Sequence, residues 1–155
     1  MAKNKTAYSL VELIILVLFL GIFAAISVPK MTFFLISKQK AETFANKVVT
    51  DLRRTRRLAI SDAATNTDGY ALNMTGDSPY TGYEIVNLKP PSATVDSHTI
   101  DSDISCTGGA TFQFGPLGNL KAESDAQLAV EAGDKTFTIT VIEATGTVKC
   151  TETEE

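Results

Sequence analysis

The apolar residues follow three different patterns along the chain. From Leu13 to Val28 the sequence has no charged residue and almost nothing polar. Beyond Pro29, apolar or small residues recur at three- and four-residue spacings, which predicts an amphipathic helix. These residues are Phe44, Val48, Leu52, Thr55 and Ala59. From Tyr70 onward, short alternating segments are separated by turns that contain glycine or proline, and this pattern predicts β-strands.

The two helical patterns adjoin each other and predict one helix from about Ser9 to Ser61. Because a proline removes a helical hydrogen bond and its ring clashes with the preceding turn, we expect a bend near Pro29. We expect the second half of the helix to pack on an antiparallel β-sheet or on two sheets. The predicted fold class is therefore α+β.

The length of the apolar segment suits a membrane. From Tyr8 to Ser27 there are twenty residues, or roughly 30 Å of helix, which matches a bilayer core. Two lysines, Lys3 and Lys5, precede the segment and predict a cytoplasmic amino terminus with the remainder outside. Three interpretations are open: a signal peptide cut near Ala25–Ser27, a single-pass anchor, and a prepilin-type signal cut before the helix.

Glu12 favours the third interpretation. A carboxylate in an apolar span costs up to about 2.5–3.5 kcal/mol if it is central, and neither a signal peptide nor a simple anchor needs one. A cut before Tyr8 would create a new α-amine, and this amine on a neighbouring subunit could pair with Glu12 and offset the desolvation of both charges. The alternative is a carboxylate that only reaches the membrane interface.

The segment from Ala7 to Leu13 resembles the cleavage and methylation motif of type IV pilins and type II secretion pseudopilins. The resemblance implies that Ala7 precedes the cut, that Tyr8 becomes the N-methylated amino terminus, and that Glu12 acts in assembly. It also implies a helix kink at Pro29. The family usually has glycine before the cut and phenylalanine after it, so Ala7 and Tyr8 are departures from its pattern.

This resemblance implies a pilin-like fold, with a long amino-terminal helix whose first half is transmembrane, packed on a β-rich head. The implied organisation is a leader (1–7), a transmembrane and filament-core helix (8–29), an amphipathic helix (30–61) and a head in the periplasm or cell exterior (62–155). The implied location is the bacterial inner membrane. The implied partners are other subunits, prepilin peptidase, an inner-membrane assembly platform and, before assembly, membrane lipid; no cofactor is implied.

Three further segments resemble the H-type minor pseudopilins of type II secretion. They are Asp51–Ser61, Phe112–Asn119 and Val141–Lys149. The resemblance implies two stacked sheets against the helix and a subunit that lies near a filament tip or is of low abundance, while a major pilin with the same head stays open.

The charges separate into a basic helix and an acidic head. Residues 30–57 carry a net charge of +6, and residues 58–155 carry −11. The basic residues include a cluster of four arginines: Arg53, Arg54, Arg56 and Arg57. One interpretation is cations near a helix carboxyl end beside an acidic head, and the other is a phosphate-binding patch for DNA uptake. Since no aromatic residues interleave with the arginines, we favour the first.

The two cysteines, Cys106 and Cys150, predict a disulfide if the head lies in an oxidising compartment. Such a bond would close a loop of roughly 43 residues and contribute about 4 kcal/mol in the chain-entropy account. The alternative is two free thiols.

The sequence contains little that indicates catalysis. His98 is the only histidine, and no zinc, P-loop or dinucleotide motif is present. The acidic segment Asp101–Asp103 lacks the spacing of a calcium loop and is interpreted as a solvated turn. We therefore predict a structural and assembly protein rather than an enzyme. The rival hypotheses are a DNA-binding minor pilin and a secreted globular protein with an ordinary signal peptide.

Overall fold

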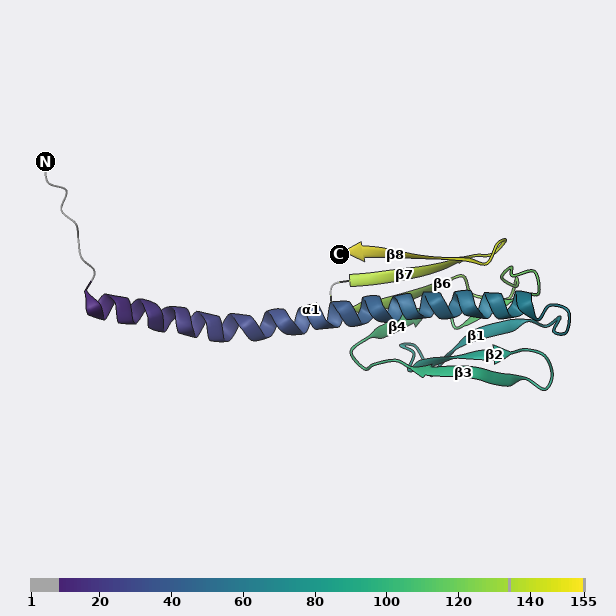
Figure 1. Cartoon of the computed structure of the whole chain (residues 1–155), viewed down its shortest axis with the longest axis horizontal. Coiled ribbons are helices and arrows are strands. Elements are labelled where there is room, and N and C mark those ends of the chain that lie inside the picture. The colour runs from purple at the N-terminus through teal and green to yellow at the C-terminus, as the bar shows by residue number, and fades with distance from the viewer. Residues whose placement is uncertain (1–8, 134, 155) are drawn as a thin grey trace, which may run out of the picture. The chain divides into compact units, whose positions relative to one another are not determined.

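The computed structural model describes residues 9–133 and 135–154, without the side chains of 26–37 and 154. The chain divides into two compact units, Met1–Ile36 and Ser37–Glu155. Within the described residues the elements are one helix, α1, and eight strands (Figure 1). Their bounds are α1 Leu10–Ser61, β1 Tyr70–Thr75, β2 Gly82–Asn87, β3 Ala93–Thr99, β4 Ser105–Gly108, β5 Thr111–Phe114, β6 Gln127–Ala132, β7 Lys135–Ile142 and β8 Thr147–Glu154.

The strands of the second unit form two four-stranded sheets. The strand order is β3-β2-β1-β5 in the first and β4-β6-β7-β8 in the second, and every pairing is antiparallel. Residues of α1 and of both sheets belong to a single hydrophobic core. The α+β class and the two-sheet head therefore agree with the sequence prediction.

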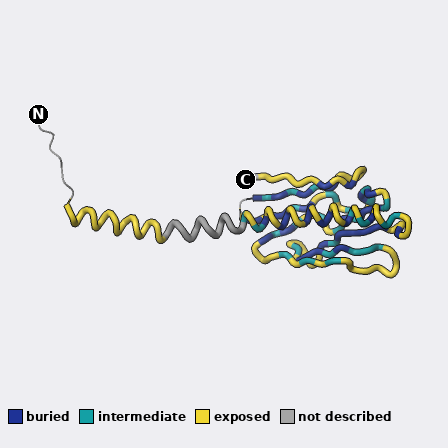
Figure 2. The backbone as a smooth tube through the Cα atoms, in the orientation of Figure 1, coloured by how far each residue is buried: buried dark blue, intermediate teal, exposed yellow. Residues whose placement is uncertain are grey.

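The part of α1 in this unit buries the face that the sequence predicts. Phe44, Val48, Leu52, Thr55 and Ala59 are all buried. Their spacing places them on one stripe of the helix, and buried and exposed positions alternate along this part of the helix (Figure 2). Because burying apolar surface stabilises a fold by on the order of 25 cal/mol per Å², this buried stripe is the main contribution of the helix to the core.

A polar cluster fixes the connection from the helix to β1. Asn66 is buried, its side-chain nitrogen donates to the carbonyl oxygen of Gly69 at 2.9 Å, and its side-chain oxygen accepts from the Gly69 backbone nitrogen at 2.9 Å. Gly69 has a φ of 78°, where a side chain would meet the Phe114 carbonyl oxygen. The turn therefore requires glycine at this position.

The prediction for the amino-terminal segment needs correction. Within the described residues, no helix combines the length and the apolar character that crossing a membrane requires. The prediction of a pilin-like helix whose first half spans a membrane is therefore wrong. The same finding contradicts the predicted location of a single-pass inner-membrane protein.

The predicted disulfide is absent. Both cysteines have free thiols, with Cys106 buried and Cys150 exposed. They lie on β4 and β8, the two outer strands of the same four-stranded sheet. Three strand spacings of about 4.8 Å separate these strands, and a disulfide tolerates a Cα separation of only about 7 Å.

Candidate functional site

The first candidate surface is the apolar segment of α1 in the amino-terminal unit. Every large hydrophobic side chain from Leu10 to Phe23 is exposed, with exposed fractions between 49% and 75%. One groove of about 550 Å³ follows a single face of this segment. It is lined by Glu12, Ile15, Leu16, Phe19, Leu20 and Phe23. A helix that is apolar on all sides is normally enclosed by other protein or by lipid, so this segment is a candidate interaction surface.

Glu12 is the only charged residue that lines this groove. Its side chain is exposed, and it forms no ion pair or hydrogen bond with any described residue. The predicted processing residues Ala7 and Tyr8 lie outside the described residues. Pro29 lies within the bounds of α1, in the part whose side chains are not described. The predicted assembly contact of Glu12 therefore stays a prediction.

The second candidate surface is made by the arginine cluster, which the structure divides. Arg54 forms an ion pair with Asp96 of β3 at 2.7 Å, and this contact lowers the pKa of the Asp96 carboxyl group. The remaining three arginines line one pocket of about 280 Å³ together with part of the β7–β8 hairpin. We call it the arginine pocket; its lining residues are Arg53, Arg56, Arg57, Ile60, Gly146, Thr147 and Val148.

Two of these arginines also join the helix to loops of the head. The guanidinium of Arg53 donates to the carbonyl oxygen of Val148 at 3.2 Å, and Arg56 Nε donates to that of Gly118 at 3.0 Å. Gly146 has a φ of 63°, and a side chain there would collide with the Gly118 carbonyl oxygen and approach Arg56. The pocket therefore depends on close packing that only glycine permits at this turn.

A buried polar contact lies on the opposite flank of the same helix. Asp51 is 7% exposed, and the Tyr83 hydroxyl donates to its Oδ2 atom at 2.6 Å. Burial, together with this carboxylate, raises the pKa of the Tyr83 hydroxyl. His98 lies 3.6 Å from the same Oδ2 and 3.7 Å from Asp96 Oδ2, and its ring contacts that of Tyr83. These groups link α1 to β2 and β3.

The sequence analysis missed the buried contact, because it did not include Asp51 in the buried stripe of the helix. The signal was present in the spacing: Asp51 lies three residues after Val48 and four before Thr55, both buried. Residues so spaced share a helix face. A carboxylate at such a position requires a hydrogen-bond donor in the core.

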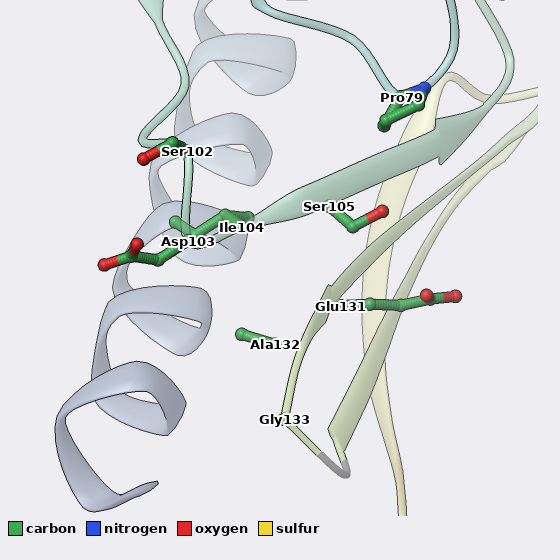
Figure 3. A pocket seen from close by; sticks show the side chains of 8 residues that line it. All are labelled: Pro79, Ser102, Asp103, Ile104, Ser105, Glu131, Ala132 and Gly133. Carbon is green, nitrogen blue, oxygen red and sulfur yellow. The ribbon is translucent and has the colours of Figure 1, made fainter. Parts of the chain in front are cut away.

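A third pocket lies beside the start of β4 (Figure 3). Asp103 precedes β4 and Glu131 belongs to β6, and both line it. Lys40 of α1 pairs with Asp103 at 2.8 Å and with Asp101 at 3.7 Å, and its hydrogen bond to Asp103 raises the pKa of the Lys40 ammonium. Among the described residues no group of three or more histidine, cysteine, aspartate or glutamate side chains is placed to hold a metal ion.

Comparison of the chain with protein-family models, with curated proteins and with solved structures finds no match.

Proposed function

We propose that the chain is a structural subunit of a filament of the type IV pilus or type II secretion kind, assembled through the apolar segment of α1. The observation that carries the proposal is the unbroken exposure of the large hydrophobic side chains from Leu10 to Phe23. Soluble monomers rarely expose continuous apolar patches larger than a few hundred Å². A surface of this kind is stabilised when several helices surround it.

The head supports the proposal because its core is complete without the apolar segment. The core cluster draws its helical residues from Ala41 onward and none from residues 10–25. The exposed segment is therefore not a piece of the head core that awaits docking. It remains available for contacts with other molecules, and identical segments of other copies are the partners that match its chemistry.

Glu12 gives the assembly a means of selecting one register. A carboxylate enclosed by apolar helices is costly unless it is paired. The partner we propose is the α-amine of Tyr8 on a neighbouring subunit, released by a prepilin peptidase that cuts after Ala7. A single buried polar pair is a well-attested way of fixing helix register.

The test is to express the full chain in cells that assemble such filaments and to measure incorporation. Glu12→Ala should abolish incorporation while the head stays folded. The matched control is Glu42→Ala, since Glu42 is also an exposed glutamate of α1 but lies outside the apolar segment. Normal incorporation of Glu12→Ala would refute the proposed role of Glu12.

The mature amino terminus tests the proposal as a whole. Intact-mass analysis should find a chain that begins at Tyr8 and carries one additional methyl group. A mature chain that begins after the apolar segment would remove the surface on which the proposal rests, and the interpretation as a secreted globular protein would replace it.

A further inference from the structure

The arginine pocket has unused capacity to bind an anion. A guanidinium has five N–H donors, and the described contacts of Arg53 and Arg56 use one donor each. Arg57 is exposed and makes no hydrogen bond or ion pair with a described residue. Three positive charges therefore converge on one small pocket, and no carboxylate among the described residues forms an ion pair with them.

The construction of the pocket suits a carboxylate or a phosphate group. The planar donor fork of arginine binds either group through two parallel hydrogen bonds. Arg56 is held against the Gly118 carbonyl oxygen and the Gly146 turn, so little conformational entropy remains to be lost when it binds. Exposed Thr147 also lines the pocket, and its hydroxyl, which accepts a hydrogen bond from Thr145 Oγ1 at 2.8 Å, keeps its own proton to donate.

The opposite end of the same head carries the complementary charge. The acidic end, as we call it, consists of Asp101 and Asp103, which both pair with Lys40, and of the exposed Glu131, so its three carboxylates outnumber this one cation. Lys40 and Arg56 are 16 residues apart on α1, which corresponds to about 24 Å along the helix. Strand β8 runs from Thr147, which lines the arginine pocket, to Glu152, which pairs with Lys135. The next residue of β7, Thr136, is the partner of Glu131 on β6, so this end of β8 lies near the acidic end.

The surroundings favour a protein carboxylate over a nucleic acid. Residues 58–155 carry a net charge of −11, which repels a polyanion. Arg54, the fourth cation of the cluster, is already neutralised by Asp96. Nucleic acids are bound through several phosphate contacts along an extended basic surface, whereas these three arginines converge on a pocket of about 280 Å³.

We propose that the arginine pocket binds a carboxylate of the acidic end of a second copy of this chain. Because the two surfaces differ and lie at opposite ends of the head, the contact is head-to-tail and leaves a free pocket and a free acidic end on the pair. Contacts of this type propagate into open helical filaments unless the rotation closes a ring. The inference rests on the proposed filament function and adds a second contact to it, one between heads.

Cross-linking between differently tagged copies tests the pairing directly. One full-length variant carries Thr147→Cys at the pocket and the other carries Ser102→Cys at the acidic end, both with Cys150→Ser to remove the exposed thiol. A short bis-maleimide should join the two variants to each other more than either to itself. The control replaces Ser102→Cys with Ser92→Cys, an exposed serine in the β2–β3 loop, and should give little product.

Charge reversal tests the chemistry of the contact. Arg57→Glu is preferred to a change at Arg56, because Arg57 makes no contact that the head needs. It should lower the cross-linking yield on the order of tenfold, and Glu131→Arg in the same chain should restore part of the yield. Lys149→Glu is the matched control, an exposed cation of β8 outside the pocket, and should have little effect. High salt should weaken the contact in the unaltered protein.

The outcomes that overturn the inference are distinct from those that overturn the filament function. Unchanged cross-linking in Arg57→Glu, or preferential Thr147→Cys self-linkage, would refute the head-to-tail contact while filaments still form. A different result would be that DNA binds the protein and blocks cross-linking, and that Arg57→Glu abolishes this binding. The arginine pocket would then be a nucleic-acid site. Cross-linking that persists in a chain that never forms filaments would retain the head contact and refute the proposed function.

Discussion

Two segments of α1 place their apolar residues in opposite environments. Residues 10–25 are apolar on every side and their described side chains are exposed. From Ala41 to Ala59 the apolar residues form a stripe that is buried against both sheets. A single stripe can be covered by one folded head. A helix without a polar face has no orientation that one partner surface could satisfy, and it needs neighbours on several sides.

The largest expected effect comes from making the same substitution in both segments. Leu52 is fully buried and Leu16 is 55% exposed. Leu52→Ala should lower the free energy of unfolding of the head by about 2–5 kcal/mol, through lost burial and a residual cavity. Leu16→Ala should leave this free energy unchanged and should instead weaken assembly.

Denaturant unfolding of the full chain in mild detergent, followed by circular dichroism of the β-signal, measures the first quantity, and filament yield measures the second. If Leu16→Ala destabilised the head as much as Leu52→Ala does, the two segments of α1 would not differ in their contribution to the core of the head. The contrast between the two environments would then be lost.

The same contrast explains which features the sequence could predict. The buried stripe followed from the spacing of Val48, Leu52 and Thr55, because one helix face determines burial locally. The absence of a bond between Cys106 and Cys150 could not be predicted, since it depends on strand order, which places β4 and β8 at opposite edges of a sheet. Both thiols were visible in the sequence, but their separation was not.

The arginine cluster illustrates the same limit for the candidate site. Four neighbouring arginines suggested one basic patch, yet a helix turns about 100° per residue. Arg54 therefore projects toward Asp96 of the first sheet. Arg53 instead reaches a carbonyl oxygen of β8 in the second sheet, and Arg56 reaches one in the segment that joins β5 to β6. The pocket forms only because the Gly118 and Gly146 turns approach the helix, and turn proximity between distant segments cannot be read from local spacing.

The second prediction concerns the carboxylate that each segment carries among apolar residues. Asp51 is buried and accepts a hydrogen bond from the Tyr83 hydroxyl, whereas Glu12 is exposed and has no partner among the described residues. Tyr83→Phe removes a donor from a buried carboxylate and should destabilise the head by about 1–3 kcal/mol. The measurement is the free energy of unfolding in denaturant.

Tyr80→Phe is the matched control for this variant. The Tyr80 hydroxyl also donates a hydrogen bond, to the Gly108 carbonyl oxygen at 2.7 Å, but that contact is exposed, so its loss should cost less. Equal destabilisation by the two variants would show that the buried carboxylate does not require Tyr83.

A third, smaller effect should appear in alkaline solution, and it should be confined to the head. Burial raises the pKa of the Cys106 thiol to about 12, against about 8.5 in an unfolded chain. A group whose pKa is higher in the folded state contributes stability that is fully present below its pKa in the unfolded chain. This stability is lost as pH rises toward its pKa in the folded protein. From about pH 8.5 the head should lose about 1.4 kcal/mol per pH unit through this group.

Denaturant unfolding between pH 8 and 10 distinguishes the contribution of the buried Cys106 thiol from that of the exposed Cys150 thiol. Cys106→Ala should remove the slope, although the variant is less stable at neutral pH because of the cavity. Cys150→Ala should retain most of the slope. An unaltered slope in Cys106→Ala would assign the alkaline sensitivity to another group.

The smallest effect is expected at the exposed ion pair between Arg54 and Asp96, because solvent screens such contacts. The pair is nevertheless informative, since it is the contact that separates Arg54 from the arginine pocket. Arg54→Ala should shift the midpoint of thermal unfolding by about 2 °C or less, and the shift should vanish at high salt.

The ion pair lowers the pKa of Asp96 in the folded protein. Its contribution to stability is therefore present above the pKa of this carboxyl group in the unfolded chain, and it is lost as pH falls through the lower pKa of the folded state. The variant should leave cross-linking between Thr147→Cys and Ser102→Cys unchanged, whereas Arg57→Glu should lower its yield on the order of tenfold. If Arg54→Ala lowered the cross-linking yield as much as Arg57→Glu, the four arginines would act as one patch and the division of the cluster would be wrong.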